Sequence, residues 1–159
     1  MVSWQATCYY TSANMKLQAT AITGKRILLV EDERAVRDAL RPLLATAGHM
    51  VVEANNGAEA FAAFLGAKFD LVVTDFEIPF VKGNELASKI RKVAPRQPIL
   101  MITAFDHKPG VSNPVDAVLH KPFNSASLLE TIARMLSPNP DAAQKVQADS
   151  PFETEIICA

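Results

Sequence analysis

The sequence is poor in cysteine, in clustered basic residues and in long apolar runs, and each shortage excludes a class of protein. Its two cysteines, Cys8 and Cys158, lie near opposite ends of the 159 residues, and neither has a partner at the spacing of a metal-binding motif. We expect free thiols in a reducing cytoplasm, with a disulfide between the two ends as the alternative. The net charge of −1 and the scattered lysines and arginines argue against surfaces for nucleic acid or membrane. No apolar run approaches the roughly 20 residues of a membrane span.

Two apolar runs end in acidic residues, and these ends are the most informative part of the chain. Residues 27–30 run into Glu31 and Asp32, and residues 69–74 run into Asp75. Such runs are typical of strands buried on both faces of a parallel sheet, whose carboxyl ends open into one crevice. The three carboxylates are therefore expected to lie close together. Because they repel one another, either one of them is protonated or a cation binds, and an all-oxygen ligand set favours a hard cation such as Mg²⁺.

From residue 25 to 137 the chain alternates strand-like and helix-like segments, which is the pattern of an α/β fold. Strands are predicted at about 26–31, 49–54, 69–75, 98–103 and 117–120, and helices at about 33–47, 57–65, 84–93 and 125–136. Residues 104–116 break the pattern, because two prolines and a glycine leave room for no more than a loop or a single turn. Five strands with these connections favour a flavodoxin-like, doubly wound parallel sheet of order 2-1-3-4-5.

Three of the predicted helices carry more detailed expectations. The first contains Pro42, which should kink it or loosen a turn, and it should end at Gly48. The last should be capped by Asn124. The apolar faces expected to be buried are Val36, Leu40, Leu43 and Leu44 in the first helix, Ala60, Phe61, Phe64 and Leu65 in the second, and Leu128, Ile132, Met135 and Leu136 in the last.

Four short motifs lie at predicted strand ends: ILLVEDE (27–33), VVTDFEIP (72–79), MITAF (101–105) and HKPF (120–123). Together, and in this order, they resemble the receiver domain of two-component response regulators over about residues 25–137. The resemblance implies a cytoplasmic signalling domain in a phosphorelay, which accepts a phosphoryl group from a sensor histidine kinase or a phosphotransfer protein. It also implies no enzymatic activity beyond this self-catalysed transfer and the hydrolysis of the aspartyl phosphate formed.

The resemblance assigns the phosphoacceptor and its metal. Asp75 would be the phosphoacceptor, and a carboxylate is a competent nucleophile for an acyl phosphate intermediate. Mg²⁺ would be bound by Asp75 and Asp32, by Glu31 directly or through water, and by the main-chain carbonyl of Glu77. A metal suits phosphoryl transfer because it neutralises spread negative charge and holds the reactants in line.

The resemblance also assigns residues to the phosphoryl group itself. Lys121 would pair with one phosphoryl oxygen, and Thr103 would hydrogen-bond another after modification. The bond between Lys121 and Pro122 is cis in this family, which would hold the lysine loop in a tight turn.

Each of these residues also has a simpler interpretation. Asp32 could cap the first helix, a role that can coexist with metal binding. Asp75 could cap the loop after its strand. Thr103 could be ordinary β-branched packing, and Lys121 a solvated lysine.

The chain departs from the family pattern in two places. The residue three before Lys121 is usually aromatic and swings inward as the threonine moves, but here it is Val118, which has no ring. Thr103 and Lys121 are 121 − 103 = 18 positions apart, about one helical turn fewer than usual. A shortened or missing fourth helix is therefore expected, and the usual dimerisation and output face is in doubt. Glu77 adds a carboxylate near the incoming phosphoryl group and is expected to alter the lifetime of the phosphorylated state.

The expected layout is a disordered leader at 1–24, a receiver domain at 25–137, and a tail at 138–159 without an output domain, so that signalling would run through protein contacts. The main alternative is a receiver-like interaction module that is not phosphorylated, which Val118 and the broken fourth helix favour. A third reading is a phosphatase of the haloacid dehalogenase type. That class usually has a second aspartate two residues after the nucleophile, where this chain has Glu77.

Overall fold

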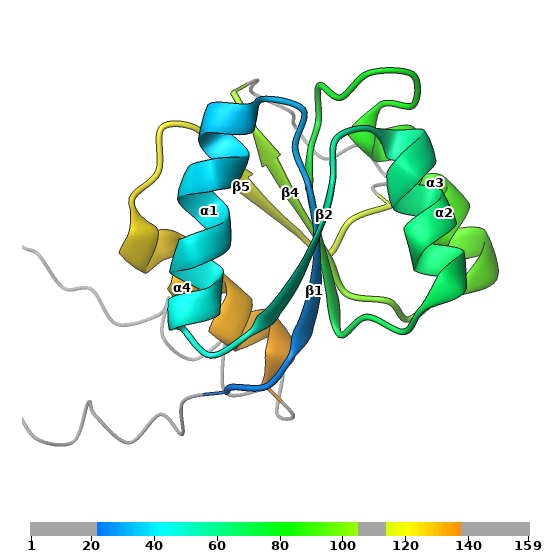
Figure 1. Ribbon diagram of the computed structural model, residues 1–159. Coiled ribbons are helices and arrows are strands. Elements are labelled where there is room, and N and C mark those ends of the chain that lie inside the picture. The colour runs from blue at the N-terminus through cyan, green and yellow to red at the C-terminus, as the bar shows by residue number, and fades with distance from the viewer. Residues whose placement is uncertain (1–21, 105–113, 138–159) are drawn as a thin grey trace, which may run out of the picture.

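Strands and helices alternate along the chain in the computed structural model, which describes residues 22–104 and 114–137 (Figure 1). In chain order the elements are β1 (Arg26–Val30), α1 (Arg34–Thr46), β2 (Met50–Ala54), α2 (Gly57–Gly66), β3 (Leu71–Asp75), α3 (Gly83–Val93), β4 (Ile99–Thr103), β5 (Ala117–His120) and α4 (Ser125–Leu136). All strands are parallel and form one sheet in the order β2-β1-β3-β4-β5. The predicted flavodoxin-like topology is confirmed.

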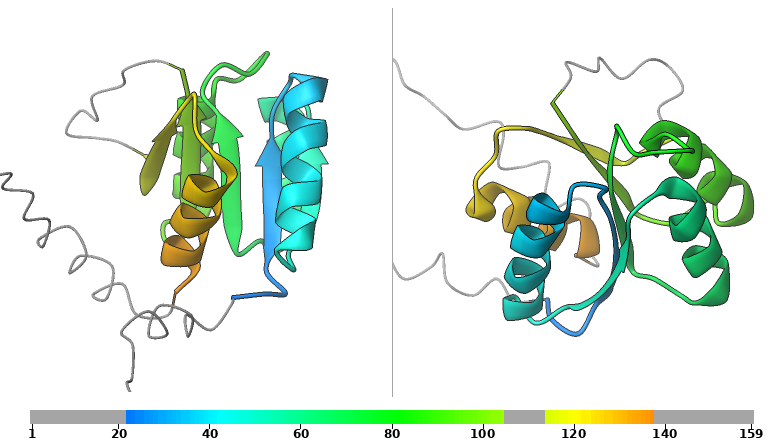
Figure 2. Two further views of the ribbon diagram at one scale, coloured as in Figure 1. Left: turned by 90° about the vertical axis from the view of Figure 1, so that its left-hand side faces the viewer. Right: turned by 45° about the horizontal axis from the view of Figure 1, so that its top comes forward.

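The sheet separates two layers of helices, with α1 and α4 on one face and α2 and α3 on the other (Figures 1 and 2). Each face has its own apolar cluster, and the strands β1, β3 and β4 contribute alternate residues to both. The interior positions of these central strands are mostly apolar because both of their faces are buried. A rigid sheet of this kind fixes where each strand ends, and the loops at its carboxyl edge inherit that order.

The strand register places the polar residues at one edge. Val30 at the end of β1 pairs with Thr74 of β3, so Asp75 lies one residue further along. Asp75 in turn pairs with Ile102 of β4, and Thr103 pairs with His120 of β5. The residues that follow β1, β3 and β5 therefore meet at the carboxyl edge of the sheet, which is the upper edge in Figure 1.

Most expected elements are present with ends within two residues, and two details of the helices were wrong. Asp32 does not cap α1, because Glu33 occupies the N-cap and its side chain makes no capping hydrogen bond. Leu65 is 61% exposed, although it was expected in the buried face of α2. Phe64 packs against the apolar cluster, and the next residue of a helix points about 100° away from that face.

Other local expectations are confirmed. The side chain of Asn124 accepts a hydrogen bond from the backbone N–H of Ser127 and caps α4. Gly48 follows α1 with a φ of 88°, a left-handed conformation that glycine adopts without strain. Pro42 lies inside α1, which continues past it as one helix, and the expected kink or loosened turn stays a prediction.

The connection between β4 and β5 contains no helix in its described residues, 104 and 114–116, whereas residues 105–113 lie outside the described part. With four helices in the described ranges, the fold agrees with a shortened or missing fourth helix. The predicted leader up to residue 21 and the tail from residue 138 also lie outside the described residues. Within residues 22–104 and 114–137, no helix has the length and apolar character to cross a bilayer.

Candidate functional site

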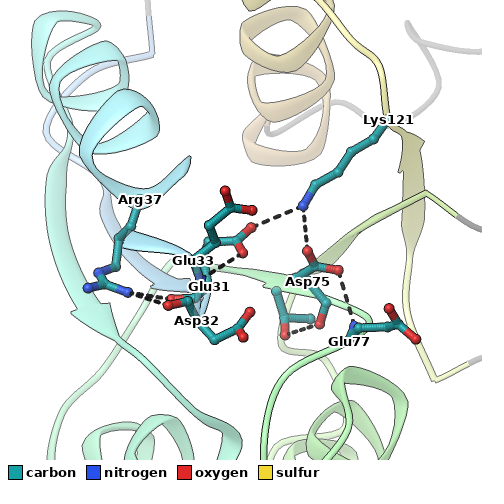
Figure 3. A network of polar contacts seen from close by, with 8 residues as sticks. Glu31, Asp32, Glu33, Arg37, Asp75, Glu77 and Lys121 are labelled. Carbon is teal, nitrogen blue, oxygen red and sulfur yellow. Dashed lines mark hydrogen bonds and ion pairs between the residues drawn. The ribbon is translucent and has the colours of Figure 1, made fainter. Parts of the chain in front are cut away.

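Three charged side chains meet at the carboxyl edge of the sheet, from the loops after β1 and β5 and the end of β3 (Figure 3). The ammonium Nζ of Lys121 lies 3.2 Å from Oε2 of Glu31 and 2.5 Å from Oδ2 of Asp75. The two carboxylates are largely withdrawn from solvent, with 3% of the Glu31 side chain and 11% of the Asp75 side chain exposed. One cation thus bridges two buried anions.

The backbone at the ends of the strands holds these side chains in place. The N–H of Glu31 donates to the carbonyl of Ala54 on β2, which continues the ladder one residue past β1. The N–H of Lys121 donates to the carbonyl of Thr103 on β4, and the Lys121–Pro122 peptide bond is cis, as the resemblance predicted. Both loops are therefore continuations of the sheet and not independent segments.

Asp75 is fixed from the side of its own loop as well. Its Oδ1 accepts a hydrogen bond of 3.1 Å from the backbone N–H of Glu77, which directs the carboxylate toward the loop. Gly83 begins α3 directly against this strand end: a Cβ there would lie 2.2 Å from the carbonyl oxygen of Asp75. Only glycine allows so close an approach, and the loop from Phe76 to Lys82 is closed by a hydrogen bond from the N–H of Gly83 to the carbonyl of Phe76.

The electrostatics of the site show that negative charge is in excess. Burial raises the pKa of the Glu31 carboxyl, and the charge of Asp75 raises it further, while Lys121 acts in the opposite direction. Burial by itself lowers the pKa of Lys121, but its hydrogen bond to Asp75 and the charges of Glu31 and Asp75 outweigh burial, so the net pKa is raised. The site therefore favours cations.

The other residues singled out from the sequence lie around this centre. Asp32 is exposed and takes part in neither contact of Lys121, and the exposed carboxylate of Glu77 points away from the ammonium (Figure 3). Thr103 is fully buried at the end of β4. Val118 is half-buried and packs against the apolar cluster on the α2–α3 face. Their assigned functions stay predictions.

Arg37 on α1 is a residue of this site that sequence reasoning missed. Its Nη1 donates 2.7 Å to the carbonyl of Glu31 and 3.4 Å to that of Asp32 (Figure 3). Its Nε also lies 4.0 Å from Oε1 of Glu53 on β2. The side chain thereby ties the loop after β1 to the start of α1. No sequence pattern pairs a helix arginine with main-chain carbonyls six positions earlier, so the contact could not be read from periodicity.

The donor set fits a hard divalent cation. Glu31 and Asp75 offer carboxylate oxygens and already hold one positive charge between them. No three side chains of Asp, Glu, His or Cys converge on a metal position in the described ranges. Mg²⁺ does not need three, because it usually keeps several waters and is bound through one or two carboxylates.

The family described as the response regulator receiver domain matches residues 27–133, most of the described structure. The chain belongs to this family. Receiver domains are signalling domains of two-component systems, and the family binds Mg²⁺ for phosphorylation. The predicted family is therefore confirmed.

Individual relatives agree in sequence and in fold. The receiver protein CpdR of Brucella abortus is 38% identical over 116 residues, which cover 70% of this chain and 97% of CpdR. FleR of Pseudomonas aeruginosa is 34% identical over 69% of this chain, but the match spans only 24% of FleR. The response regulator TrrA of Thermotoga maritima, solved with Mg²⁺ and BeF, is 35% identical with a TM-score of 0.66, covering 70% of this chain and 99% of that one. TrrA has also been solved in complex with the histidine kinase ThkA.

Proposed function

We propose that this receiver accepts a phosphoryl group on Asp75 from the phosphohistidine of a sensor kinase or phosphotransfer protein. The observation that carries the proposal is the buried pair of Glu31 and Asp75 with the Lys121 ammonium between them. A structural cap at the end of β3 does not need a second buried carboxylate and a lysine from two other parts of the sheet edge. A phosphoryl site does, because the lysine, and a cation that the two carboxylates would hold, offset the further negative charge that the site must accept.

The transfer balances as a simple displacement. A carboxylate oxygen of Asp75 forms a bond to phosphorus, the bond between phosphorus and the histidine nitrogen breaks, and the electron pair stays on that nitrogen, which takes a proton. Lys121 is placed to shift its ammonium from Oδ2 of Asp75 to a phosphoryl oxygen. We assign Thr103, at the end of the neighbouring strand, to hydrogen-bond another phosphoryl oxygen.

Mg²⁺ would be held by Glu31, Asp32, Asp75 and the main-chain carbonyl of Glu77. When bound, it neutralises charge on the phosphoryl oxygens. TrrA, with its Mg²⁺ and BeF, and its complex with ThkA support both the metal and a histidine kinase as partner. Output is proposed to run through contacts with an unidentified downstream protein in the cytoplasm, without nucleic acid or membrane.

Intact-mass measurement after incubation with Mg²⁺ and acetyl phosphate tests the proposal, with Asp75→Ala alongside. We expect a phosphoryl adduct that hydroxylamine removes and that the variant lacks. A chain that gains no adduct and does not bind beryllium fluoride would contradict it.

That negative result would favour a second function, an interaction module that is not phosphorylated. Val118, in place of the usual aromatic residue, is the observation in its favour. Steady turnover of a phosphomonoester such as p-nitrophenyl phosphate would instead indicate a phosphatase.

A further inference from the structure

The loop after the phosphoacceptor presents one aromatic side chain to solvent. Phe80 is 88% exposed, well above the other exposed large apolar residues, Met50, Leu65 and Val93, at 55–61%. It lies five positions after Asp75, in the connection from β3 to α3 that rises above the carboxyl edge of the sheet (Figure 1). Burial among the described residues does not account for a phenyl ring at this position.

The backbone at Phe80 is strained. Its φ is 67°, and it is the one non-glycine residue with positive φ in the described ranges. The N–H of Val81 donates 2.8 Å to the carbonyl of Pro79, which makes Phe80 the central residue of a γ-turn. A γ-turn with positive φ at its centre is the rare and strained form, and glycine or asparagine would occupy it at lower cost. The sequence thus has a bulky apolar residue where both conformation and solvent exposure disfavour one.

Neighbouring contacts anchor the turn on both sides of Phe80. Ile78 is buried, and Val81 packs against the apolar cluster. The carbonyl of Val81 lies so close to α2 that a Cβ on Gly57 would meet it at 2.4 Å. With both sides of the turn anchored, the backbone of Phe80 is held in a set place relative to Asp75, and its ring extends into solvent.

The geometry points to Phe80 as a docking anchor for the protein that delivers the phosphoryl group, a partner with an apolar pocket beside its phosphohistidine. The inference rests on the proposed function. A protein that brings a phosphohistidine to Asp75 approaches the carboxyl edge of the sheet, and the loop with Phe80 begins there, directly after Asp75. An exposed aromatic residue that becomes buried in an interface is typical of a binding hot spot. Backbone strain at a side chain whose burial does not offset it points to a role in binding another molecule.

Phe80→Asn separates docking from folding, because asparagine tolerates the left-handed conformation. We expect its Tm to rise by about 4 °C as the strain is relieved, while transfer from a protein donor weakens. Phe80→Leu keeps an apolar side chain and should be intermediate. Leu65→Gln is the matched control, since it removes exposed apolar surface at the C-terminal end of α2, away from the carboxyl edge.

Two phosphoryl donors are compared, acetyl phosphate and an autophosphorylated histidine kinase. The kinase is chosen by screening the purified histidine kinases of the organism that encodes this chain for the one that labels the wild type fastest. Acetyl phosphate should label all four proteins equally. With the phosphorylated kinase as donor, kcat/KM for transfer should fall about 10–100-fold in Phe80→Asn because KM rises. It should stay unchanged in Leu65→Gln.

Several results would overturn the inference: transfer to Phe80→Asn at the wild-type rate, an equal loss with acetyl phosphate, no kinase that labels the wild type, or a wild-type dimer that Phe80→Asn dissociates. A wild type that neither gains a phosphoryl adduct from acetyl phosphate nor binds beryllium fluoride would instead refute the proposed function, so the two failures are distinguishable.

Discussion

Replacing Lys121 by methionine removes the cation between Glu31 and Asp75 while keeping a side chain of similar length. In the wild type the ammonium lies within 3.2 Å of both carboxylates. Without it, two buried negative charges face each other, and the folded state must either tolerate the repulsion or take up a proton. We expect a loss of stability that depends steeply on pH.

The size of the stability loss follows from the cost of protonating one of the two carboxylates. Burial already raises the pKa of Glu31 above its ordinary value of 4.5, so Glu31 is the group that takes the proton. Keeping the Glu31 carboxyl protonated at pH 7, when its ordinary pKa is 4.5, costs about 3.4 kcal/mol. This cost is the upper limit of the stability that Lys121→Met loses, because the folded state can always take up the proton. We therefore expect a loss of about 2–3 kcal/mol at pH 7 and less than about 1 kcal/mol at pH 5. The loss is larger at pH 7 than at pH 5 because a carboxyl whose pKa is raised in the folded state, here that of Glu31, contributes stability at low pH that is lost as the pH rises.

Thermal unfolding followed by circular dichroism measures the effect, in chelator at pH 5 and at pH 7. The Tm of Lys121→Met should be about 6–12 °C below that of the wild type at pH 7 and much closer at pH 5. Lys89→Met, which changes an exposed lysine on α3, is the control. Adding MgCl₂ should stabilise Lys121→Met more than the wild type, because Lys121 no longer competes for the carboxylates. Equal Tm values at pH 7, or a larger difference at pH 5, would refute the reasoning.

Three further predictions address other parts of the structure. Arg37→Met removes the donor to the carbonyls of Glu31 and Asp32, and calorimetry should show Mg²⁺ binding about tenfold weaker with an unchanged far-UV spectrum; unchanged affinity would contradict the positioning role. Burial lowers the pKa of His49, so the folded state binds fewer protons than the unfolded chain and loses stability as the pH falls below about 6.5. Urea unfolding between pH 5 and 7 should show this slope, and it should disappear in His49→Leu. Glu77→Asn should change the decay rate of the phosphorylated protein by about twofold or more, because it alters charge at the mouth of the site; an identical decay would count against it.

The strands and the site loops were predictable because their signals are local. Ile27 to Val30 and Leu71 to Val73 are apolar on both faces of the pleat, and in a chain of this pattern only central parallel strands bury both. The polar residue after each run then marks the carboxyl edge. This is why Glu31 and Asp75 could be named from the sequence, and why they meet in the structure.

Details that depend on exact helix ends and side-chain direction were not predictable. Asp32 and Glu33 are both acidic and adjacent, so the sequence does not decide which of them occupies the N-cap of α1. Leu65 continues an apolar run but lies beyond the buried face of its helix. The strain at Phe80 depends on how Val81 and Ile78 are anchored, which no local pattern reveals.

The sequence by itself determined the alternation of strands and helices, the acidic strand ends and the family, because periodicity and short motifs are properties of neighbouring residues. Only the tertiary structure decided that Lys121 contacts Glu31 from 90 positions away and Asp75 from 46 positions away, and that Arg37 holds the loop after β1. Such contacts depend on sheet order, register and the packing of helices on both faces. These arise from the burial of the whole core and are not encoded in any one segment.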